Sequence, residues 1–578
     1  MPELTCSTLD RRGFLRAGGT ALLGVALSSD RAPALLRGRW RDAAAADVRI
    51  DVLPWETIGP VTPLHYGHFI EHLGGVIYDG VWVGERSSIP NVGGIRKALV
   101  DDLRGLTPGI VRWPGGCFAD SYDWRDGIGP REERPRRASF WAGELPASVT
   151  GPSRYEPNHF GSPEFMRFCR LIGAEPYLAV NGRGLGGREF AHWVEYCNAP
   201  AGTTTFGDRR VRDGSREPHN VRYWGLGNEP WGCGGMLTPE EYAAEYRRLA
   251  SWVPAFPSVD PRLIAAGPLE GVDDEAWTRR FIESMLSAGR YAEMPHGYSI
   301  HSYFWRRDAL DFTPDGWYAL LAEPRKLKNM LQRQALLLRA ARAPLTLVLD
   351  EWGPWYIGDT GQTDPSHLFE QIPTLRDALV TAMMFDIFHA HANVLSVATV
   401  AQTVNSIHSL FLTQGDRCVR TPVYHAFALY QPHIGGTAVR TVAVAEQIGF
   451  TMDGREAGPT ATSGAEGTRG WVDGVSASAT IHEPPGSGSG RIVLTVTNPR
   501  LEQAVTVTIA LHGAVVRSGN VTTLTHSDMH ARNTFAEPNA VHVGATTPLV
   551  LPTNGASDTF TLTLSPASVT RVVGTLGR

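Results

Sequence analysis

Short apolar runs alternate with longer amphipathic segments between about residue 64 and residue 415. Each run ends at glycine, proline or a polar side chain, and its short length is typical of a buried β-strand. The pattern predicts eight strands, at residues 66–70, 110–113, 176–180, 221–226, 263–266, 298–303, 345–349 and 394–400.

The segments between these runs carry apolar residues at three- and four-residue spacing, which predicts helices. One of them opens with Thr238 as N-cap, Pro239 at the first position and Glu241 three residues after the cap. Alternating strands and helices in this number predict a (β/α)8 TIM barrel, an α/β fold. A doubly wound open sheet is the alternative, but no G-x-G-x-x-G motif follows the first strand. The clearest helical segments are 94–106, 163–173, 187–198, 239–253 and 325–341.

Beyond about residue 425 the pattern changes to alternating threonine and valine, as in RIVLTVTNP and AVTVTIAL. This alternation, with turn residues between the runs, predicts antiparallel strands and a C-terminal β-sandwich. A strand-like segment, DVRIDV, precedes the barrel, and we expect it to join the C-terminal sheet. The predicted division is a signal and linker at 1–45, this strand at 46–63, a catalytic barrel at 64–425 and the β-sandwich at 426–578.

The N-terminus pairs Arg11 with Arg12 ahead of a weakly apolar stretch at 17–28. A charged region before a short apolar core is typical of a secretory signal, and the arginine pair resembles a twin-arginine signal. The sequence therefore predicts export to an extracellular or periplasmic location. A disordered tail with a chance arginine pair is the alternative. The stretch is too short to span a bilayer, and no other segment is long and apolar enough to do so.

Composition and cysteine usage exclude several classes of protein. The chain is 42% hydrophobic and 20% charged, as in an ordinary soluble globular protein. The net charge of −5 argues against a nucleic-acid partner, which would require a basic face. Without the predicted signal, five of the six cysteines remain, and they have no tight spacing. This pattern indicates neither a disulfide framework nor a zinc site.

Two glutamates directly follow the fourth and seventh predicted strands: Glu229 in YWGLGNEPWG and Glu351 in LTLVLDEWGPWY. TIM barrels carry their reactive groups at the carboxyl ends of the strands, and these two strands lie nearly across the barrel. Two carboxylates facing one bond are what glycoside hydrolysis requires, one as acid and one as nucleophile. A helix cap or an arginine ion pair is the alternative for each glutamate alone, but the two together favour catalysis.

Other polar residues near the strand ends fit a sugar site. Asn228 can hydrogen-bond the sugar hydroxyl next to the anomeric carbon. His72, His301 and His408 lack metal-ligand spacing, and we interpret them as buried histidines that hydrogen-bond carboxylates. The glycine-rich segment 181–190 can bind phosphate at a helix start, but we interpret it as a barrel loop.

Tryptophans also gather near the predicted strand ends. Aromatic faces stack on sugar rings, so these residues favour a carbohydrate ligand. For Trp113 and Trp224 we prefer ordinary core packing. The tryptophans at or near strand ends are Trp113, Trp224, Trp231, Trp305, Trp352 and Trp355.

A series of sequence blocks between about residue 64 and residue 435 carries a resemblance to a known family. They include HFIEHLGGVIYDGVWVG, VRWPGGCFADSYDWRDGIGPREERP, YWGLGNEPWGCGG, LDEWGPWY, PTLRDALVTAMMFDIFH, AQTVNSIHSLFLT and TPVYHAFALY. These blocks resemble the α-L-arabinofuranosidases of glycoside hydrolase family 51, and a β-sandwich like that of the family follows them.

The resemblance implies a retaining mechanism, with Glu229 matching the acid/base and Glu351 the nucleophile. It implies no metal and no organic cofactor. Cys117 stands where some members carry an asparagine that contacts the sugar, and Asp123 stands where similar sequences often have histidine or asparagine. The residues expected to bind the arabinofuranose or orient the nucleophile are Glu71, Arg112, Cys117, Asn228, Tyr303, Trp355 and Gln402.

The expected activity is removal of terminal non-reducing α-L-arabinofuranosyl residues from arabinan, arabinoxylan or their oligosaccharides. The same catalytic pair acting on another sugar, as in a D-arabinofuranosidase, β-xylosidase or endoglucanase, is one alternative. A non-catalytic carbohydrate-binding protein is a second, but the intact Glu229, Glu351, Asn228 and Arg112 argue against it. The resemblance also implies a homo-oligomer, specifically a hexamer.

Overall fold

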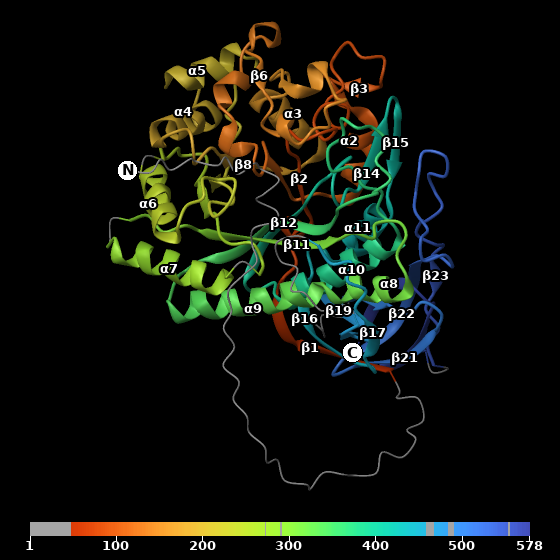
Figure 1. Ribbon diagram of the computed structural model, residues 1–578. Coiled ribbons are helices and arrows are strands. Elements are labelled where there is room, and N and C mark those ends of the chain that lie inside the picture. The colour runs from red at the N-terminus through yellow and green to blue at the C-terminus, as the bar shows by residue number, and fades with distance from the viewer. Residues whose placement is uncertain are drawn as a thin grey trace, which may run out of the picture.

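The computed structural model describes residues 48–577, apart from 252, 272, 290–291, 458–466, 484–489 and 553–554. The predicted signal at 1–45 lies outside the described residues. A barrel ringed by helices occupies the centre and top of the view in Figure 1, and a β-sheet domain lies below it.

Eight parallel strands close into a barrel in chain order, which confirms the predicted (β/α)8 fold. The last strand pairs with the first, so the barrel has no open edge. All eight predicted runs form these strands, and the two that extend furthest beyond their predicted ends are β11 and β12. The barrel strands are β2 (Gly67–Phe69), β5 (Ile110–Trp113), β8 (Glu175–Val180), β9 (Tyr223–Leu226), β10 (Arg262–Ala265), β11 (Gly297–Arg306), β12 (Thr346–Tyr356) and β13 (Leu395–Val400).

Amphipathic helices pack their apolar faces against the outside of these strands. α6 (Pro239–Ala250) begins as predicted, because Thr238 caps it and the Glu241 carboxylate accepts from Thr238 N at 2.8 Å. Trp113 and Trp224 are fully buried in this core, as expected. The other α-helices of the described residues are α2 (Lys97–Leu106), α3 (Ser162–Ile172), α4 (Gly187–Asn198), α5 (Thr205–Arg212), α7 (Asp274–Ser287), α8 (Pro314–Ala322), α9 (Pro324–Ala340), α10 (Leu375–Ala390) and α11 (Pro422–Tyr430).

A nine-stranded sheet packs beneath the barrel and includes one strand from the N-terminal side of the barrel. This strand, β1 (Val48–Pro60), runs antiparallel to β16 and parallel to β21. In Figure 1 it appears in red among the blue C-terminal strands. Apolar side chains from both halves of the sheet share one core, as the predicted sandwich requires. The other strands are β16 (Thr437–Val444), β19 (Ser476–His482), β20 (Arg491–Asn498), β21 (Val505–Leu511), β22 (Val515–Thr525), β23 (Thr547–Pro548), β24 (Thr559–Leu564) and β25 (Ser568–Gly577).

Within the described residues, four two-stranded antiparallel sheets lie in the loops of the two parts. They are β3 (Asn91–Val92) with β4 (Ile95–Arg96), β6 (Arg137–Ala138) with β7 (Tyr155–Glu156), β14 (Phe411–Gln414) with β15 (Arg417–Arg420), and β17 (Ile448–Thr451) with β18 (Arg469–Val472).

Helix α10 lies between the barrel and the sheet, which explains why it is buried almost all round. Its Asp386 carboxylate accepts hydrogen bonds from Ser476 and Ser478 of the sheet. Helix α11 runs across residue 425, and β16 begins at residue 437. We therefore propose that the boundary between the two parts falls between residues 430 and 437. Within the described residues, every helix is too short or too polar to cross a bilayer.

Candidate active site

A β-bulge in β12, at the carboxyl end of the barrel, places the adjacent Asp350 and Glu351 against the same arginine, Arg112. His301 of β11 pairs with Glu351 of β12, whereas Ile300 pairs with Leu349, so Asp350 is an extra residue. Consecutive strand residues normally point to opposite faces. Here Asp350 and Glu351 both contact Arg112, at 3.4 Å from its Nε and 2.7 Å from its Nη1.

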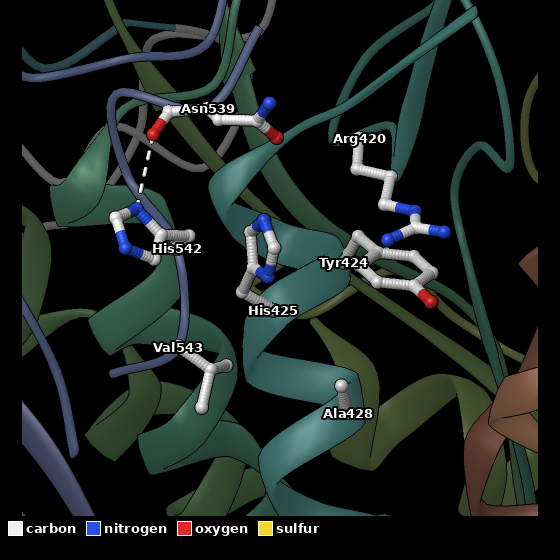
Figure 2. A pocket seen from close by; sticks show the side chains of 7 residues that line it. All are labelled: Arg420, Tyr424, His425, Ala428, Asn539, His542 and Val543. Atoms are coloured by element: carbon white, nitrogen blue, oxygen red, sulfur yellow. Dashed lines mark hydrogen bonds between the residues drawn. The ribbon is translucent and has the colours of Figure 1, made fainter. Parts of the chain in front are cut away.

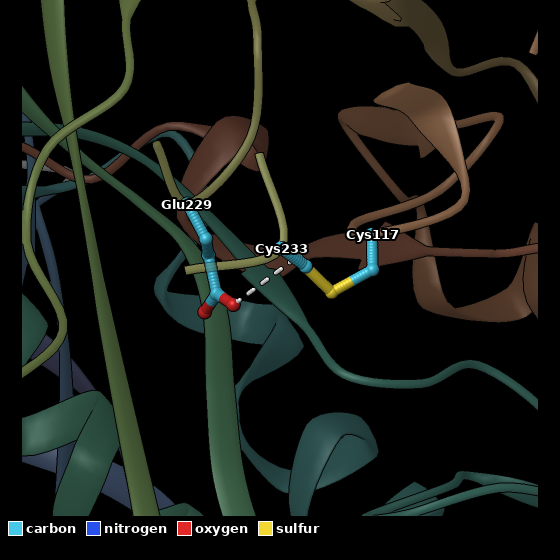
Figure 3. A group of neighbouring side chains, drawn as sticks. All are labelled: Cys117, Glu229 and Cys233. Carbon is cyan, nitrogen blue, oxygen red and sulfur yellow. Dashed lines mark hydrogen bonds between the residues drawn. A yellow bond between two sulfur atoms is a disulfide. The ribbon is translucent and has the colours of Figure 1, made fainter. Parts of the chain in front are cut away.

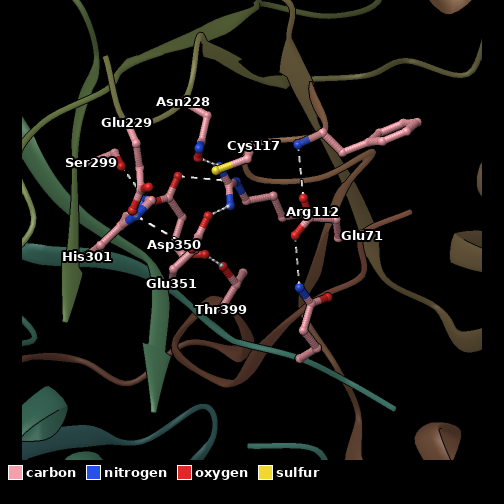
Figure 4. A network of polar contacts seen from close by, with 12 residues as sticks. Glu71, Arg112, Cys117, Asn228, Glu229, Ser299, His301, Asp350, Glu351 and Thr399 are labelled. Carbon is pink, nitrogen blue, oxygen red and sulfur yellow. Dashed lines mark hydrogen bonds and ion pairs between the residues drawn. The ribbon is translucent and has the colours of Figure 1, made fainter. Parts of the chain in front are cut away.

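Arg112 of β5 is the buried cation at the centre of this network, as Figure 4 shows. Its Nη1 donates to Glu351 Oε1 and its Nη2 to Asn228 Oδ1, each at 2.7 Å. Tyr303 of β11 donates its hydroxyl proton to Glu351 Oε2 at 2.6 Å. Donors on both oxygens fix the Glu351 carboxylate in one orientation.

Glu229 lies in the loop after β9 and faces Glu351 across His301. The His301 Nδ1 atom is 2.8 Å from Glu229 Oε1 and 3.6 Å from Glu351 Oε2. The contact atoms of these three side chains all lie within 4.8 Å of one another. His301 Nε2 lies 3.1 Å from Asp350 Oδ1. The expected contact of a buried histidine with a carboxylate is therefore present here.

Glu71 and Gln402 form the opposite side of the site. Glu71 Oε1 accepts from Phe118 N at 3.0 Å, and Glu71 Oε2 accepts from Gln402 Nε2 at 3.1 Å. The Gln402 Oε1 atom is buried and has no hydrogen-bond partner among the described residues. A buried carbonyl oxygen without a partner is a favourable acceptor for a ligand hydroxyl.

Cys117 and Cys233 form a disulfide bond beside Glu229, as Figure 3 shows. The bond corrects the sequence analysis, which found no sign of disulfide bonding in the cysteine pattern, because the two cysteines are 116 residues apart and only the fold brings them together. They lie on the loops after β5 and β9, which closure of the barrel brings together. Cys233 Sγ is 3.7 Å from Glu229 Oε2. The bond therefore lies directly at the site.

Aromatic side chains from β11 and β12 continue the site outward. The two strands pair Trp305 with Trp355 in register, and their rings stack with centroids 4.2 Å apart. Tyr303 and Phe369 each pack edge-on against Trp355 with centroids 5.0 Å away. Trp231 belongs to the same half-buried cluster. Of the tryptophans expected near a sugar, Trp231, Trp305 and Trp355 thus lie in this cluster. Trp352 does not, because it is buried in the core against Phe385 and Phe388 of α10.

Burial and neighbouring charges shift the pKa values of several groups in the site. Burial raises the pKa of Glu229, while the hydrogen bond with His301 opposes this rise. Burial and the charge of Glu351 raise the pKa of Glu71 to about 7. Burial opposes a charged His301, but the charges of Glu351 and Asp350 raise its pKa to about 10. At neutral pH His301 is therefore protonated and donates from both nitrogens.

Asp120 is a buried carboxylate that the sequence interpretation missed. It lies in the 3-10 helix η2 (Ala119–Ser121) and accepts from Asn228 N at 3.1 Å and from Gly182 N at 2.8 Å. Burial raises its pKa to about 7. Gly182 belongs to the glycine-rich segment, which forms the loop between β8 and α4. The sequence offered one sign of Asp120: it is an acidic residue three positions after Cys117, in the loop that follows a predicted barrel strand.

Three other residues singled out in the sequence lie outside the network around Arg112. His72 Nδ1 contacts Glu156 Oε2 at 2.8 Å, another histidine–carboxylate pair. His408 Nε2 contacts Thr381 Oγ1 at 2.7 Å. Asp123 caps the 3-10 helix η3 (Trp124–Gly127) by accepting from Arg125 N at 3.0 Å.

Two groups of described residues have the geometry of a possible metal site: Cys117, Glu229 and Cys233, and Glu229, His301 and Glu351. In the first group the two sulfurs are bonded to each other, which removes the thiolates that a metal would need. In the second group both nitrogens of His301 already contact carboxylates. Glycoside hydrolysis by two carboxylates requires no metal. The expectation that this protein uses no metal stays a prediction.

A separate surface pocket of about 440 Å³ lies between α11 and residues 539–543, as Figure 2 shows. Its lining includes Arg420, His425 and His542 but no carboxylate. The pair of carboxylates that glycoside hydrolysis needs is therefore absent from this pocket.

Comparisons with known proteins agree with this geometry. The family model described as "Alpha-L-arabinofuranosidase 1 domain" matches residues 102–304, and the one described as "Alpha-L-arabinofuranosidase C-terminal domain" matches residues 350–568. An intracellular exo-α-L-arabinofuranosidase of Bacteroides ovatus is 33% identical over 82% of this chain and 86% of its own.

That relative contradicts the predicted export, because its name places it inside the cell. An arginine pair before a weakly apolar stretch is a short pattern with little specificity. The residues that carry the pattern lie outside the described part of the chain.

Solved structures give the same result for the fold. The GH51 arabinofuranosidase of Xanthomonas axonopodis pv. citri superposes with a TM-score of 0.79 and 31% identity, covering 91% of this chain and 100% of its own. An α-L-arabinofuranosidase of Thermotoga maritima, solved with arabinose, superposes with a TM-score of 0.75 and 29% identity over the same shares. The chain therefore belongs to the α-L-arabinofuranosidases of glycoside hydrolase family 51.

Proposed function

We propose that this arabinofuranosidase works by double displacement with retention, using Glu351 as nucleophile and Glu229 as acid/base. The observation that carries this proposal is the separation of the two carboxylates. The nearest oxygens of Glu229 and Glu351 are no more than 4.8 Å apart, and His301 Nδ1 contacts both carboxylates. Retaining glycosidases have carboxyl groups about 5–5.5 Å apart, whereas inverting enzymes leave about 6.5–9.5 Å for a water molecule.

In the first step Glu351 attacks the anomeric carbon while Glu229 protonates the departing glycosidic oxygen. Arg112 and Tyr303 hold the two oxygens of Glu351, so the nucleophile is oriented before the substrate arrives. Burial raises the pKa of Glu229, which favours the protonated form that the acid role needs.

In the second step Glu229, now ionised, takes a proton from water, and the water attacks the arabinosyl–enzyme ester. Protonated His301 touches both glutamates and can stabilise whichever one carries the charge. The surrounding charges therefore stay fixed while the proton and the covalent bond move.

Side-chain donors and acceptors that other protein groups do not use can form hydrogen bonds with the arabinofuranosyl ring. We propose that Glu71 and the free Oε1 of Gln402 accept from sugar hydroxyls. Asn228 Nδ2 lies 3.6 Å from the sulfur of Cys233, a weak acceptor, and can donate to the hydroxyl next to the anomeric carbon. Cys117 and Trp355 supply apolar surface along the ring and beyond it.

We propose that the substrates are terminal non-reducing α-L-arabinofuranosyl groups on arabinan, arabinoxylan or their oligosaccharides. The exo designation of the Bacteroides ovatus relative supports action at chain ends.

By family resemblance we also propose a homo-oligomer, specifically a hexamer, which sedimentation of the purified protein would test.

Hydrolysis of a panel of 4-nitrophenyl glycosides tests both the sugar and the residues. The expected result is activity on the α-L-arabinofuranoside and loss of that activity in Glu351→Ala, with α-D-arabinofuranoside and β-xyloside poorly cleaved. Preference for another sugar would change the proposed substrate but not the catalytic pair. An active Glu351→Ala variant would overturn the proposed nucleophile.

A further inference from the structure

The loop that carries Glu229 is bent into conformations that side chains rarely adopt. Glu229 has a φ of 39° in the left-handed region, and Gly227, two residues earlier, has a φ of 85°. Gly232 N and Gly234 N both donate to the Glu229 carbonyl, at 2.8 Å and 3.1 Å, and close a tight turn around it. A left-handed non-glycine residue is strained and persists only where its surroundings hold it.

One such restraint is Asp120, whose side chain lies between two loops. Its two oxygens accept from Asn228 N and Gly182 N, so one carboxylate connects the loops after β5, β8 and β9. A Cβ atom on Gly234 would lie 1.9 Å from Asn228 O and 3.0 Å from Asp120 Oδ2. At Gly234 the acid-bearing loop therefore packs closely against Asp120 and leaves no space for a side chain.

The second restraint is the Cys117–Cys233 bond, which joins the loops after β5 and β9 with Cα atoms 5.6 Å apart. Figure 3 shows that the bond lies beside the Glu229 side chain. Cys233 Sγ lies 3.7 Å from Glu229 Oε2, the carboxylate oxygen that faces away from His301. The bond thus limits where this carboxylate oxygen can move.

We propose that Asp120 and the Cys117–Cys233 disulfide together form a clamp that positions Glu229 for proton transfer. Neither member of the clamp transfers the proton; both are positioning groups that act through the Glu229 loop. The inference rests on the proposed role of Glu229 as acid/base. It adds a dependence of acid catalysis on a buried carboxylate and on the oxidation state of one cysteine pair.

A misplaced acid has a kinetic signature that general instability lacks. Arabinofuranosides with a poor leaving group, such as a methyl or alkyl alcohol, need protonation of the departing oxygen, whereas a 2,4-dinitrophenolate departs without it. General acid catalysis contributes about 10²–10⁴-fold to rate. Loosening the clamp should remove part of this factor for the poor leaving group only.

The first test compares Asp120→Asn with wild type on both substrates. Asn keeps the size of Asp but can accept at only one of its two terminal atoms, so one backbone donor loses its partner. We expect kcat/KM for the alkyl arabinofuranoside to fall about ten-fold or more, and kcat/KM for the dinitrophenyl arabinofuranoside to change by less than about three-fold. Equal losses on both substrates, or no loss, would overturn the role of Asp120.

Asp386→Asn is the matched control, because it also alters a buried carboxylate with several donors but lies at the contact between α10 and the sheet. It should leave the ratio of the two kcat/KM values at the wild-type value. Glu229→Ala is the reference for complete loss of the acid. If Glu229→Ala fails to change the ratio, the proposed function fails; if only Asp120→Asn fails to change it, the clamp alone fails.

The second test opens the disulfide with dithiothreitol. Two electrons and two protons pass from the dithiol to the bond, leaving two cysteine thiols and a cyclic disulfide of the reagent. We expect the same selective loss on the alkyl arabinofuranoside, reversed by reoxidation and already present in Cys117→Ser/Cys233→Ser, which should not respond to reductant. Cys117 also lies in the proposed glycone site, but both substrates share that glycone.

A chelator belongs in the reduced samples, since free thiols at Cys117 and Cys233 beside Glu229 would form a possible site for a thiophilic metal ion. Verified reduction, by titration of the new thiols, without any change in the ratio of kcat/KM values would overturn the role of the disulfide.

Discussion

At the scale of single residues, Glu351 and Glu229 differ in the contacts that their carboxylates make. Arg112 and Tyr303 donate to the two oxygens of Glu351. Glu229 has His301 on one oxygen and a disulfide sulfur near the other. A buried carboxylate that is held in one orientation suits a nucleophile, and a carboxyl group with a raised pKa suits an acid. The division of roles follows from these environments.

The pH dependence of activity should report the raised pKa of Glu229. The acid must be protonated in the first step, so activity is present below its pKa and is lost as pH rises through it. Because burial raises that pKa, the alkaline limb of kcat/KM should lie above the ordinary range of a glutamate. The limb should appear for an alkyl arabinofuranoside, whose leaving oxygen must be protonated, and should be absent for the dinitrophenyl arabinofuranoside, whose leaving group departs without a proton. The same alkaline limb on both substrates would assign it to another group.

Tyr303→Phe should slow catalysis without disrupting the fold. The change removes the 2.6 Å hydrogen bond to Glu351 Oε2 and leaves the ring packed against Trp355. A hydrogen bond to a charged group contributes about 1.5–3 kcal/mol, so we expect kcat/KM to fall about 10- to 150-fold. Circular dichroism and the melting temperature should stay near those of wild type. A fall confined to the melting temperature would contradict the orienting role.

At the scale of elements, apolar periodicity predicted the eight barrel strands because each is a short buried run. It did not predict how far β11 and β12 continue, since buried Arg306 ends one apolar run and the sequence DEWGP interrupts the other. The bulge at Asp350 was also invisible, because it depends on the register between two strands. The bulge is what brings Asp350 and Glu351 to the same arginine.

Motif position placed Glu229, Glu351, Arg112 and Gln402 at the barrel mouth, where the structure also has them. Contacts between loops far apart in sequence were not predictable in the same way. Asp120 and the Cys117–Cys233 bond join loops that meet only after the barrel closes. Spacing along the chain carries no information on such pairs.

Thr238→Ala should weaken α6, the helix that begins where the Glu229 loop ends. Thr238 accepts from Glu241 N, and the loss of such a cap costs about 0.5–2 kcal/mol. Urea unfolding should show this decrease in the free energy of unfolding. Arg248→Ala, a change at an exposed position of the same helix, is the control and should have little effect. Equal effects of the two variants would contradict the capping argument.

At the scale of the whole molecule, the barrel and the β-sandwich behave as one packed unit. Trp317 of α8 donates to Pro499 O at 2.9 Å, and the buried Arg306 of β11 contacts Asp453 at 2.7 Å. β1 ties the chain ahead of the barrel into the distal sheet. Buried polar contacts of this kind make separate folding of either part unfavourable.

Asp386 makes the contact between barrel and sheet sensitive to pH. Burial raises its pKa to about 7, so the folded state favours the protonated form. Its contribution to stability is complete below the unfolded pKa, about 3.9, and is lost as pH rises through about 7. Asp386→Asn cannot ionise, so its stability relative to wild type should improve between pH 5 and about 8. Parallel pH profiles of the two melting temperatures would contradict this assignment.

The most direct test of the central claim is to identify the residue that carries the sugar during turnover. The protein is incubated with an arabinofuranosyl reagent that forms a slowly hydrolysed ester, and its peptides are mapped by mass spectrometry. Double displacement through Glu351 predicts one arabinosyl label on Glu351 in wild type and none in Glu351→Ala. A label on another residue would contradict the double displacement proposed here, as would turnover with inversion at the anomeric carbon.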